Sequence, residues 1–377
     1  MKRRIADHLK NLRGWRTSRK LVAFAVDDYA NVGIASPAAR ERLIAAGLDL
    51  SGQMGRYDSL ETRQDLETLF QVLDSVRDGK GQSAVFTPYV LAANPNFAAI
   101  REDGAQYHPE PVHQTFERLA AVQPQAYEGA WALWQEGIRR GLVRPQCHGR
   151  EHLNIALFEH KLRQRAPDLL ANLENESLAG IESDPAMPGV EFTHAFGLHD
   201  RAELARHREI LSDTFDAFEQ VWGYRSTTFT PPALLLHPDL HEDVVQYGVD
   251  SIDKPLRCSR PLGDGTHKRE INQSGRQRGQ NHVTVVRNVV FEPGKDMGFE
   301  PVSRALEQIQ AAFFWHHPAV ISSHRVNFCG HIDEDYRKNG LEALSRLLQG
   351  IVRRWPEVEF VSVDRLVAEM EPKKAAS

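Results

Sequence analysis

The sequence predicts a parallel α/β fold. Short apolar runs that suit buried strands alternate along the chain with longer segments whose apolar residues recur at helical spacing. Strands alternating with helices are typical of parallel sheets. Three of the apolar runs end in acidic or histidine residues, and the carboxyl ends of parallel strands are where such folds build their sites. Periodicity alone does not decide whether the sheet closes into a barrel.

Composition narrows the class of protein. With 377 residues, the chain can bury a large core, either as one large domain or as two. A net charge of −5 argues against a general nucleic-acid binder, and no apolar window is long enough to span a bilayer. The basic N-terminus is followed by no apolar signal-peptide core, so we expect a cytoplasmic protein. Three widely spaced cysteines predict neither a disulfide framework nor a cysteine zinc cluster.

The first predicted strand, residues 21–31, reads LVAFAVDDYAN. It begins with five apolar residues and ends in the neighbouring acids Asp27 and Asp28. Adjacent side chains of a strand normally point to opposite faces, but where the strand ends both carboxylates can turn toward one pocket. One could then hold a cation while the other handles a proton. The alternative is a loop pair that caps the next helix.

The other elements follow in order along the chain. Ser36 and Pro37 suit the N-cap and first position of a helix that Gly47 closes. The further predicted helices are 61–78, 131–141, 201–222, 238–247, 301–315 and 334–355. The further predicted strands are 82–88, 142–148, 226–229, 249–252, 283–291, 319–323 and 358–363.

A polar, Gly- and Arg-rich insertion at 257–281 interrupts the alternation. It contains six basic residues and two acids: Arg257, Arg260, Asp264, Lys268, Arg269, Glu270, Arg276 and Arg278. We expect it near the mouth of the site, where it would help to bind an anionic substrate; the alternative is a solvated hairpin. The predicted organisation is a basic extension at 1–19, one α/β domain at 20–370 that carries this insertion, and a tail at 371–377.

A second motif, residues 147–154, reads CHGREHLN. His148 and His152 are four residues apart, so on a helical turn both imidazoles would share one face and suit one cation. Another such pair, His237 and His241, sits where a helix begins, and we interpret it as cap and surface residues. His148 instead follows an apolar run and would reach the same end of the sheet as Asp28.

Asp28, His148 and His152 would supply one carboxylate and two imidazoles, a common set for zinc or iron(II). A catalytic zinc keeps a position open for water and lowers the pKa of that water. Asp27 could take its proton, and a second group must protonate the leaving atom. The candidate acid is His324, at the end of the apolar run 319–323.

Together these motifs resemble the polysaccharide deacetylases of the NodB-homology type, carbohydrate esterase family four. The first family motif is Thr-Phe-Asp-Asp-Gly, with a base followed by a metal ligand; residues 25–29 keep both acids but lack the Thr and the Gly. The second is His-Ser/Thr-x-x-His, in which Gly149 replaces the hydroxyl residue. The third is Arg-x-Pro-Tyr/Phe-Gly, which residues 229–233 match without the Arg and the aromatic. The resemblance extends over about 20–370 and implies a distorted (β/α) barrel of about seven strands.

The resemblance also implies an activity. The enzyme would use a divalent metal, with zinc the first choice, to remove an N-acetyl or other acyl group from a sugar or a polysaccharide precursor. In the family the Arg of the third motif orients the catalytic Asp, so Arg225 or another residue must do this for Asp27. A backbone N–H at Ala233 could still serve an oxyanion hole. The substrate contacts that we expect are Thr230, Pro231, Arg287, Glu292 and Arg325.

Two other readings stay open. The substrate could be a small non-sugar amide, as in allantoinase-like relatives of the same fold, because ligands specify chemistry and loops specify substrates. The chain could also be a catalytically weak sugar-binding protein of polysaccharide assembly. Metal content and then turnover separate these readings.

Overall fold

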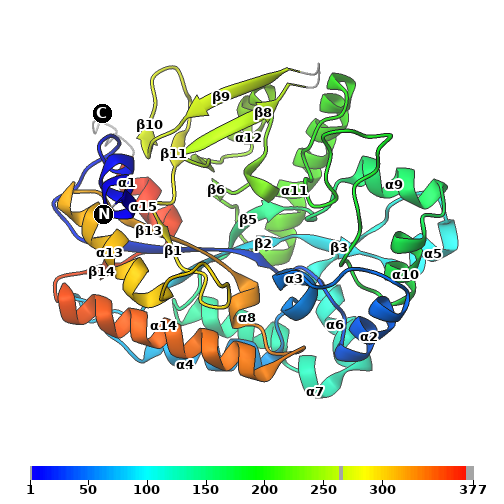
Figure 1. Ribbon diagram of the computed structural model, residues 1–377, viewed down its shortest axis with the longest axis horizontal. Helices are drawn as coiled ribbons and strands as arrows, with labels where there is room; N and C mark the ends of the chain where they lie inside the picture. Colours follow the sequence, from blue (N-terminus) through cyan, green and yellow to red (C-terminus); the bar gives the residue numbers. More distant parts are fainter. Residues whose placement is uncertain (1, 263–265, 371–377) are drawn as a thin grey trace.

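The computed structural model describes residues 2–262 and 266–370, so the predicted tail at 371–377 and Asp264 of the insertion lie outside the described residues. Its centre is a curled sheet of ten strands in the order β10-β11-β7-β6-β5-β2-β1-β13-β12, with β14 paired to β1 (Figure 1). All neighbours are parallel except β10, which runs antiparallel to β11. The strands are β1 (Leu21–Tyr29), β2 (Phe86–Leu91), β5 (Gln146–Gly149), β6 (Thr228–Phe229), β7 (Ser251–Asp253), β10 (Gly275–Arg276), β11 (Val283–Val285), β12 (Val289–Val290), β13 (Ala319–His324) and β14 (Glu359–Phe360).

Helices fill most connections between these strands. They are α1 (Lys2–Lys10), α2 (Pro37–Ala45), α3 (Gln53–Tyr57), α4 (Arg63–Asp74), α5 (Phe97–Asp103), α6 (Val112–Val122), α7 (Pro124–Tyr127), α8 (Ala130–Arg139), α9 (Ile155–Arg163), α10 (Pro167–Glu174), α11 (Leu204–Trp222), α12 (His241–Gln246), α13 (Pro301–Phe314), α14 (Glu334–Arg354) and α15 (Val363–Met370). Two short antiparallel pairs lie outside the main sheet: β3 (Ala93–Pro95) with β4 (Pro109–Pro111), and β8 (Arg257–Pro261) with β9 (His267–Ile271). No described helix has the length and apolar character needed to cross a membrane.

Strand β1 separates two layers of core. All nine of its residues are buried. Val22, Phe24 and Val26 belong to the large core that α4, α8 and α14 share. Leu21, Ala23 and Ala25 point the other way, into the concave side of the sheet, where α15 covers them. This alternation is the two-residue period of a strand, and it places Asp27 on the concave side above Ala25.

The predicted strand 283–291 is in fact two strands. β11 lies between β10 and β7, next to one edge of the sheet, and β12 pairs with β13 at the other edge. Residues 286–288 connect β11 to β12. Among the described residues no strand pairing joins these two sides of the sheet, so this backbone segment is the link between them. A barrel of about seven strands is therefore only an approximate description of this curled sheet. The polar side chain in this crossing, Arg287, is thereby brought over the concave face.

The insertion at 257–281 forms the β8–β9 hairpin and then β10 (Figure 1). The hairpin follows the carboxyl end of β7, as expected for a loop near the site. Arg276 does not lie there, because it pairs with Val283 at the amino end of β11. The basic extension at 1–19 contains α1, which packs against α13.

Arg325 is a structural residue in this fold rather than the expected substrate contact. Its side chain is fully buried, and its guanidinium donates to both carboxylate oxygens of Asp58 at 2.9 and 2.8 Å and to Glu61 at 3.1 Å. It also donates to the carbonyl of Asn31 at 2.5 Å, while Glu61 accepts from the backbone N–H of Ala30. The group therefore fixes the backbone that follows β1.

We expect Arg325→Met to destabilise the protein strongly, because it leaves two buried carboxylates without their cation. Breaking a buried ion pair by removing one partner typically costs about 3–5 kcal/mol. The measurement is urea unfolding followed by circular dichroism. The matched control is Arg225→Met, which removes an exposed guanidinium paired with Glu219 and should change stability by no more than about 0.5 kcal/mol. Equal unfolding midpoints for the two variants would show that the buried network contributes nothing.

Candidate metal and hydrolytic site

Asp28, His148 and His152 come together at the carboxyl ends of β1 and β5. One potential ligand atom from each lies within 4.8 Å of the others. The Nε2 atoms of His148 and His152 are 3.4 and 3.3 Å from Oδ1 of Asp28. The predicted helical turn is absent, because His152 lies in a non-helical turn before α9 begins at Ile155. The two imidazoles meet all the same, with ring centroids 5.0 Å apart.

A β-bulge explains how neighbouring acids reach one pocket. Between Val26 and Tyr29 the register of β1 against β2 shifts, so that β1 carries an extra residue there. Asp28 has φ of 72°, in the left-handed region that Asp adopts more readily than most residues. Bulges re-aim side chains beside active sites, and here the bulge turns Asp28 to the end of the sheet at which Asp27 also lies. Strand β5 shows a similar shift at His148.

His148 is held in the tautomer that a metal ligand needs. Its Nδ1 lies 2.7 Å from the carbonyl oxygen of Thr230, which only accepts hydrogen bonds, so Nδ1 carries the proton. Nε2 then has a free lone pair, and it is buried with no hydrogen-bond partner among the described residues. A carbonyl behind a ligating imidazole is the usual orienting contact in metal sites.

The charges of the triad also suit a cation. Burial lowers the pKa of His152 to about 4, so its imidazole is neutral at neutral pH. Burial alone would raise the pKa of Asp28, but the histidines around it outweigh burial and hold that pKa well below its usual range. Neutral imidazoles and an ionised carboxylate are the forms that bind divalent metals.

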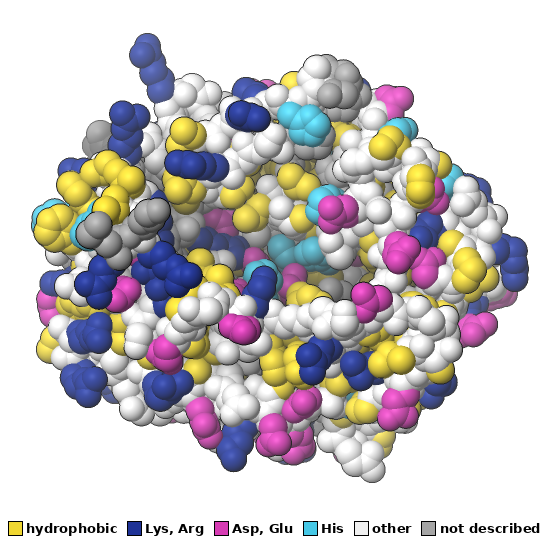
Figure 2. All heavy atoms as spheres, viewed as in Figure 1, with side chains coloured by type: hydrophobic (Ala, Val, Ile, Leu, Met, Phe, Trp, Pro, Cys, Tyr) yellow, Lys and Arg dark blue, Asp and Glu magenta, His cyan; other side chains and the backbone are white. Residues whose placement is uncertain are grey.

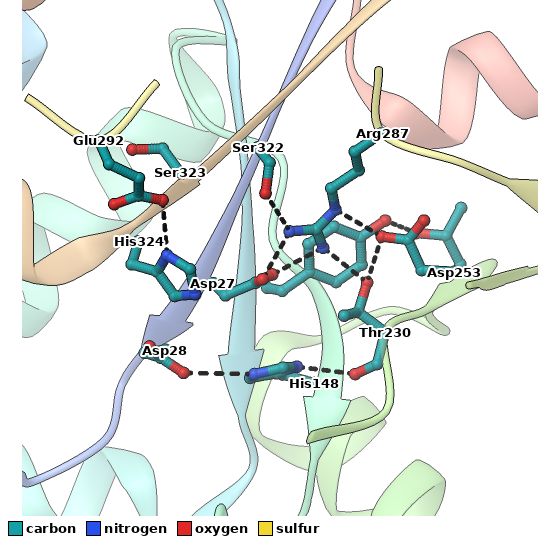
Figure 3. Close-up of polar contacts among 12 residues, drawn as sticks. Asp27, Asp28, His148, Thr230, Asp253, Arg287, Glu292, Ser322, Ser323 and His324 are labelled. Atoms are coloured by element: carbon teal, nitrogen blue, oxygen red, sulfur yellow. Dashed lines mark hydrogen bonds and ion pairs between the residues drawn. The ribbon is translucent and has the colours of Figure 1, made fainter. Parts of the chain in front are cut away.

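Asp27 lies on the other side of this site and is held by Arg287 (Figure 3). The guanidinium donates to both oxygens of Asp27, at 2.5 and 2.7 Å. Its Nε donates to Asp253 at 2.7 Å, and its central carbon lies over the Tyr89 ring, 5.3 Å from the centroid. Burial would raise the pKa of Asp27, but the charge and hydrogen bonds of Arg287 lower it, so the carboxylate is ionised.

Several residues expected to contact substrate are instead buried supports. The hydroxyl of Thr230 donates to Asp253 at 3.0 Å and accepts from Arg287 at 3.1 Å. Pro231 is buried beside it. Arg287 is the residue that holds Asp27, whereas Arg225 lies on the surface with Glu219. The lone Arg within the apolar run 283–291 was a usable signal for this role.

His324 completes the site from the neighbouring strand. It is the partner of Asp27 in the register of β13 against β1. Its Nδ1 lies 2.7 Å from Oε1 of Glu292, and its side chain is 42% exposed. Burial opposes the imidazolium charge, but the hydrogen bond to Glu292 and the nearby acids raise the pKa of His324 to about 10. Glu292, expected to touch substrate, is therefore the partner of His324, and its other oxygen accepts from Asn327 at 2.6 Å.

Figure 2 shows a hollow near the middle of the molecule, with histidine and acidic side chains at its floor. The competing pair lies elsewhere. His237 caps a short helix by accepting from the backbone N–H of Asp239, as expected, but it is buried rather than at the surface. Among the described residues, the Asp28 triad is the group of three potential ligands close enough to share a metal ion.

The sequence matches no protein-family model and no curated protein. Solved structures to which this structure is similar include a putative polysaccharide deacetylase from Mycobacterium smegmatis, at 13% identity and a TM-score of 0.45 over 97% of this chain and 96% of that one. A family 4 carbohydrate esterase from Streptomyces lividans, in complex with acetate, gives 12% identity and a TM-score of 0.34 over 90% of both chains. A 4-alpha-glucanotransferase from Thermococcus litoralis gives 10% and 0.42 over 94% of this chain and 41% of that one.

We expect the purified protein to bind one divalent metal ion per chain, and His148→Ala and His152→Ala to lose it, because each substitution removes one of three ligands. Elemental analysis after removal of loosely bound metal is the measurement. His237→Ala is the control, since it removes a buried histidine outside the triad. Metal lost from His237→Ala but kept in the other two variants would assign the ion to the competing pair.

Proposed function

We propose that the protein is a metal-dependent hydrolase that removes an N-acyl group from a sugar or a polysaccharide precursor. The acyl group that we favour is acetyl. The observation that carries this proposal is the placement of three different units at one end of the sheet. These are a carboxylate with two imidazoles, a carboxylate held by Arg287, and an imidazole held by Glu292. Amide hydrolysis needs all three functions: an electrophilic centre, a base and an acid.

Asp28, His148 and His152 would hold the cation, and zinc suits this mixture of nitrogen and oxygen donors. When bound, a divalent ion supplies Lewis acidity toward a carbonyl and lowers the pKa of water. The unpartnered, buried Nε2 of His148 supports this assignment, because a lone pair left without a partner in the interior is costly.

Asp27 is placed to accept a proton from the attacking water. Arg287 occupies one lone pair on each carboxylate oxygen, so further acceptor positions remain. The lowered pKa makes Asp27 a weaker base but keeps it ionised over the working range of pH. The bidentate contact also fixes the plane of the carboxylate, which orients those remaining lone pairs.

His324 is placed to protonate the leaving nitrogen. An amine anion is too poor a leaving group to depart without a proton, so the reaction needs an acid as well as a base. The pKa of about 10 keeps His324 protonated at neutral pH, and its partial exposure lets it reach a bound substrate. Glu292 accepts from Nδ1, which leaves Nε2–H as the donor toward substrate.

The kind of substrate that carries the acyl group is inferred from the motifs rather than from the geometry. The order of the motifs along the chain resembles sugar deacetylases, which favours an N-acyl sugar over a small amide. The paired charges at Asp27 and His324 favour an enzyme over a sugar-binding protein, since binding alone would not need a buried arginine held between two acids.

Asp27→Asn and His324→Ala should each lower kcat by about 10²–10⁴-fold while the metal content stays unchanged. The first keeps the shape of the side chain but removes the base, and the second removes the acid. The measurement is release of acetate from N-acetylated sugars, alongside elemental analysis. Activity within about threefold of the wild type in either variant would contradict the assigned role. A fully metal-loaded wild type with no turnover on any N-acetylated sugar would favour the small-amide or the binding-protein reading.

Glu292→Gln should move the alkaline limit of the pH–rate profile downward. The charge and hydrogen bond of Glu292 raise the pKa of His324, so the acid loses its proton at lower pH without them. Activity is therefore retained at acidic and neutral pH and lost earlier as the pH rises. Glu219→Gln, which alters a surface ion pair, is the control and should leave the profile in place. An alkaline limit that Glu292→Gln does not move would mean that His324 is not the acid.

A further inference from the structure

Helix α1 packs against the protein through its polar side. Asp7 accepts from Arg304 at 2.8 Å and from Gln308 at 3.3 Å, both on α13. Asn11, just after the helix, accepts from Asn288 at 2.9 Å. Asp7 and Asn11 are only 3% and 1% exposed. The side of α1 that faces the protein is thus the polar one.

The apolar side of α1 faces outward. Ile5 and Leu9 lie one turn apart on the same face and are 52% and 60% exposed. Leu12, just beyond the helix, is 40% exposed, and Phe314 at the end of α13 is 65% exposed. The Phe314 ring packs edge-on against His8 of α1, 5.3 Å between centroids. We call Ile5, Leu9, Leu12 and Phe314 the α1 patch; Figure 2 shows hydrophobic side chains gathered over α1 and the end of α13, at the left of the view.

This arrangement inverts the usual one, because a surface helix normally buries its apolar stripe. The patch also groups four of the nine exposed large hydrophobic side chains among the described residues. Scattered exposed hydrophobics are ordinary, but a contiguous group marks a contact surface.

The surroundings of the α1 patch are basic. Asp7 is the one acid in residues 1–20, and it is buried. Arg13 and Arg16 are exposed in the same segment, and so is Arg4, which forms an ion pair with Glu307 of α13 at 2.7 Å. The segment also meets the insertion, since the N–H of Trp15 donates to the carbonyl of Ser274 at 2.8 Å.

The insertion extends this basic border. Gly275 packs closely against Trp15, and Arg278, three residues further along, is exposed. Arg13, Arg16 and Arg278 thus place positive charge beside the apolar patch of a chain whose net charge is −5. An apolar surface bordered by Arg matches the chemistry of an anionic lipid bilayer, whose headgroups attract cations and whose acyl region accepts apolar side chains.

We propose that the α1 patch binds the protein to the surface of an anionic membrane. The apolar side chains would enter the boundary between headgroups and acyl chains, while the arginines contact lipid phosphates. A second copy of the chain is the competing occupant. Two copies that met patch to patch would bring two basic borders together, and like charges oppose such a contact.

Membrane binding would leave the candidate site accessible. Phe314 comes just before β13 and so lies toward its amino end, whereas His324 is at its carboxyl end. The two surfaces therefore belong to opposite ends of the same strand. This inference does not depend on the proposed activity, and it is tested without any substrate.

The test is flotation of the full-length protein with vesicles of phosphatidylcholine alone, and with vesicles of equal parts phosphatidylcholine and phosphatidylglycerol. We expect binding to the mixed vesicles that weakens as salt is added. The double variant Ile5→Ser/Leu9→Ser should bind at least about tenfold more weakly, because two apolar side chains no longer enter the bilayer. Arg13→Ala and Arg278→Ala should each weaken binding by about fivefold.

Val122→Ser is the matched control. Val122 is 67% exposed at the end of α6, away from the patch, so its variant should bind like the wild type. Circular dichroism and metal content should be unchanged in every variant, since the substituted side chains are exposed. Absence of wild-type binding to the mixed vesicles would overturn the proposal. So would a dimer in sedimentation analysis that Ile5→Ser/Leu9→Ser dissociates, because the patch would then be an interface between copies.

Discussion

The structure depends on one buried cation, the guanidinium of Arg287, which binds Asp27 on one side and Asp253 on the other. Burying an ion group costs several kcal/mol per charge unless the geometry satisfies it, and here both oxygens of Asp27 and one of Asp253 accept hydrogen bonds from the same group. The guanidinium reaches this place because the chain crosses from β11 to β12 over the concave face. The link that joins the two edges of the sheet thus also positions the candidate base.

The adjacent acids Asp27 and Asp28 have different roles because they have different neighbours. Asp27 continues the alternation of β1 and meets a fixed cation, so its charge is already balanced by the protein. Asp28 follows the bulge and meets two imidazoles, one of which is neutral through burial, so its charge is not balanced in the same way. An ion is therefore better accommodated beside Asp28 than beside Asp27. His324 stands opposite Asp27 in the register and is charged through Glu292, which places the candidate acid and base on neighbouring strands.

Local patterns were enough to predict the α/β class, most of the helices and the meeting of Asp28 with His148 and His152. They failed where the outcome depended on contacts between distant segments. The run 283–291 is uniformly suited to a strand, and nothing in it shows that its two halves pair with opposite edges of the sheet. Arg325 follows a candidate catalytic residue, so proximity in sequence suggested the same pocket, but β13 ends at His324 and the side chain of Arg325 enters a buried ion-pair network instead. Its partners, Asp58 and Glu61, lie far away in the chain and could not be paired with it from the sequence.

The central claim is that one catalytic centre lies at the carboxyl ends of β1, β5 and β13. A crystal structure of the protein soaked with zinc and acetate, with anomalous diffraction measured at the zinc edge, tests this claim most directly. The account predicts an anomalous peak bonded to Asp28, His148 and His152, with acetate between that ion and the side chains of Asp27 and His324, and Arg287 still bound to Asp27. Zinc bound elsewhere in the chain, with the triad empty and its side chains unchanged, would contradict it.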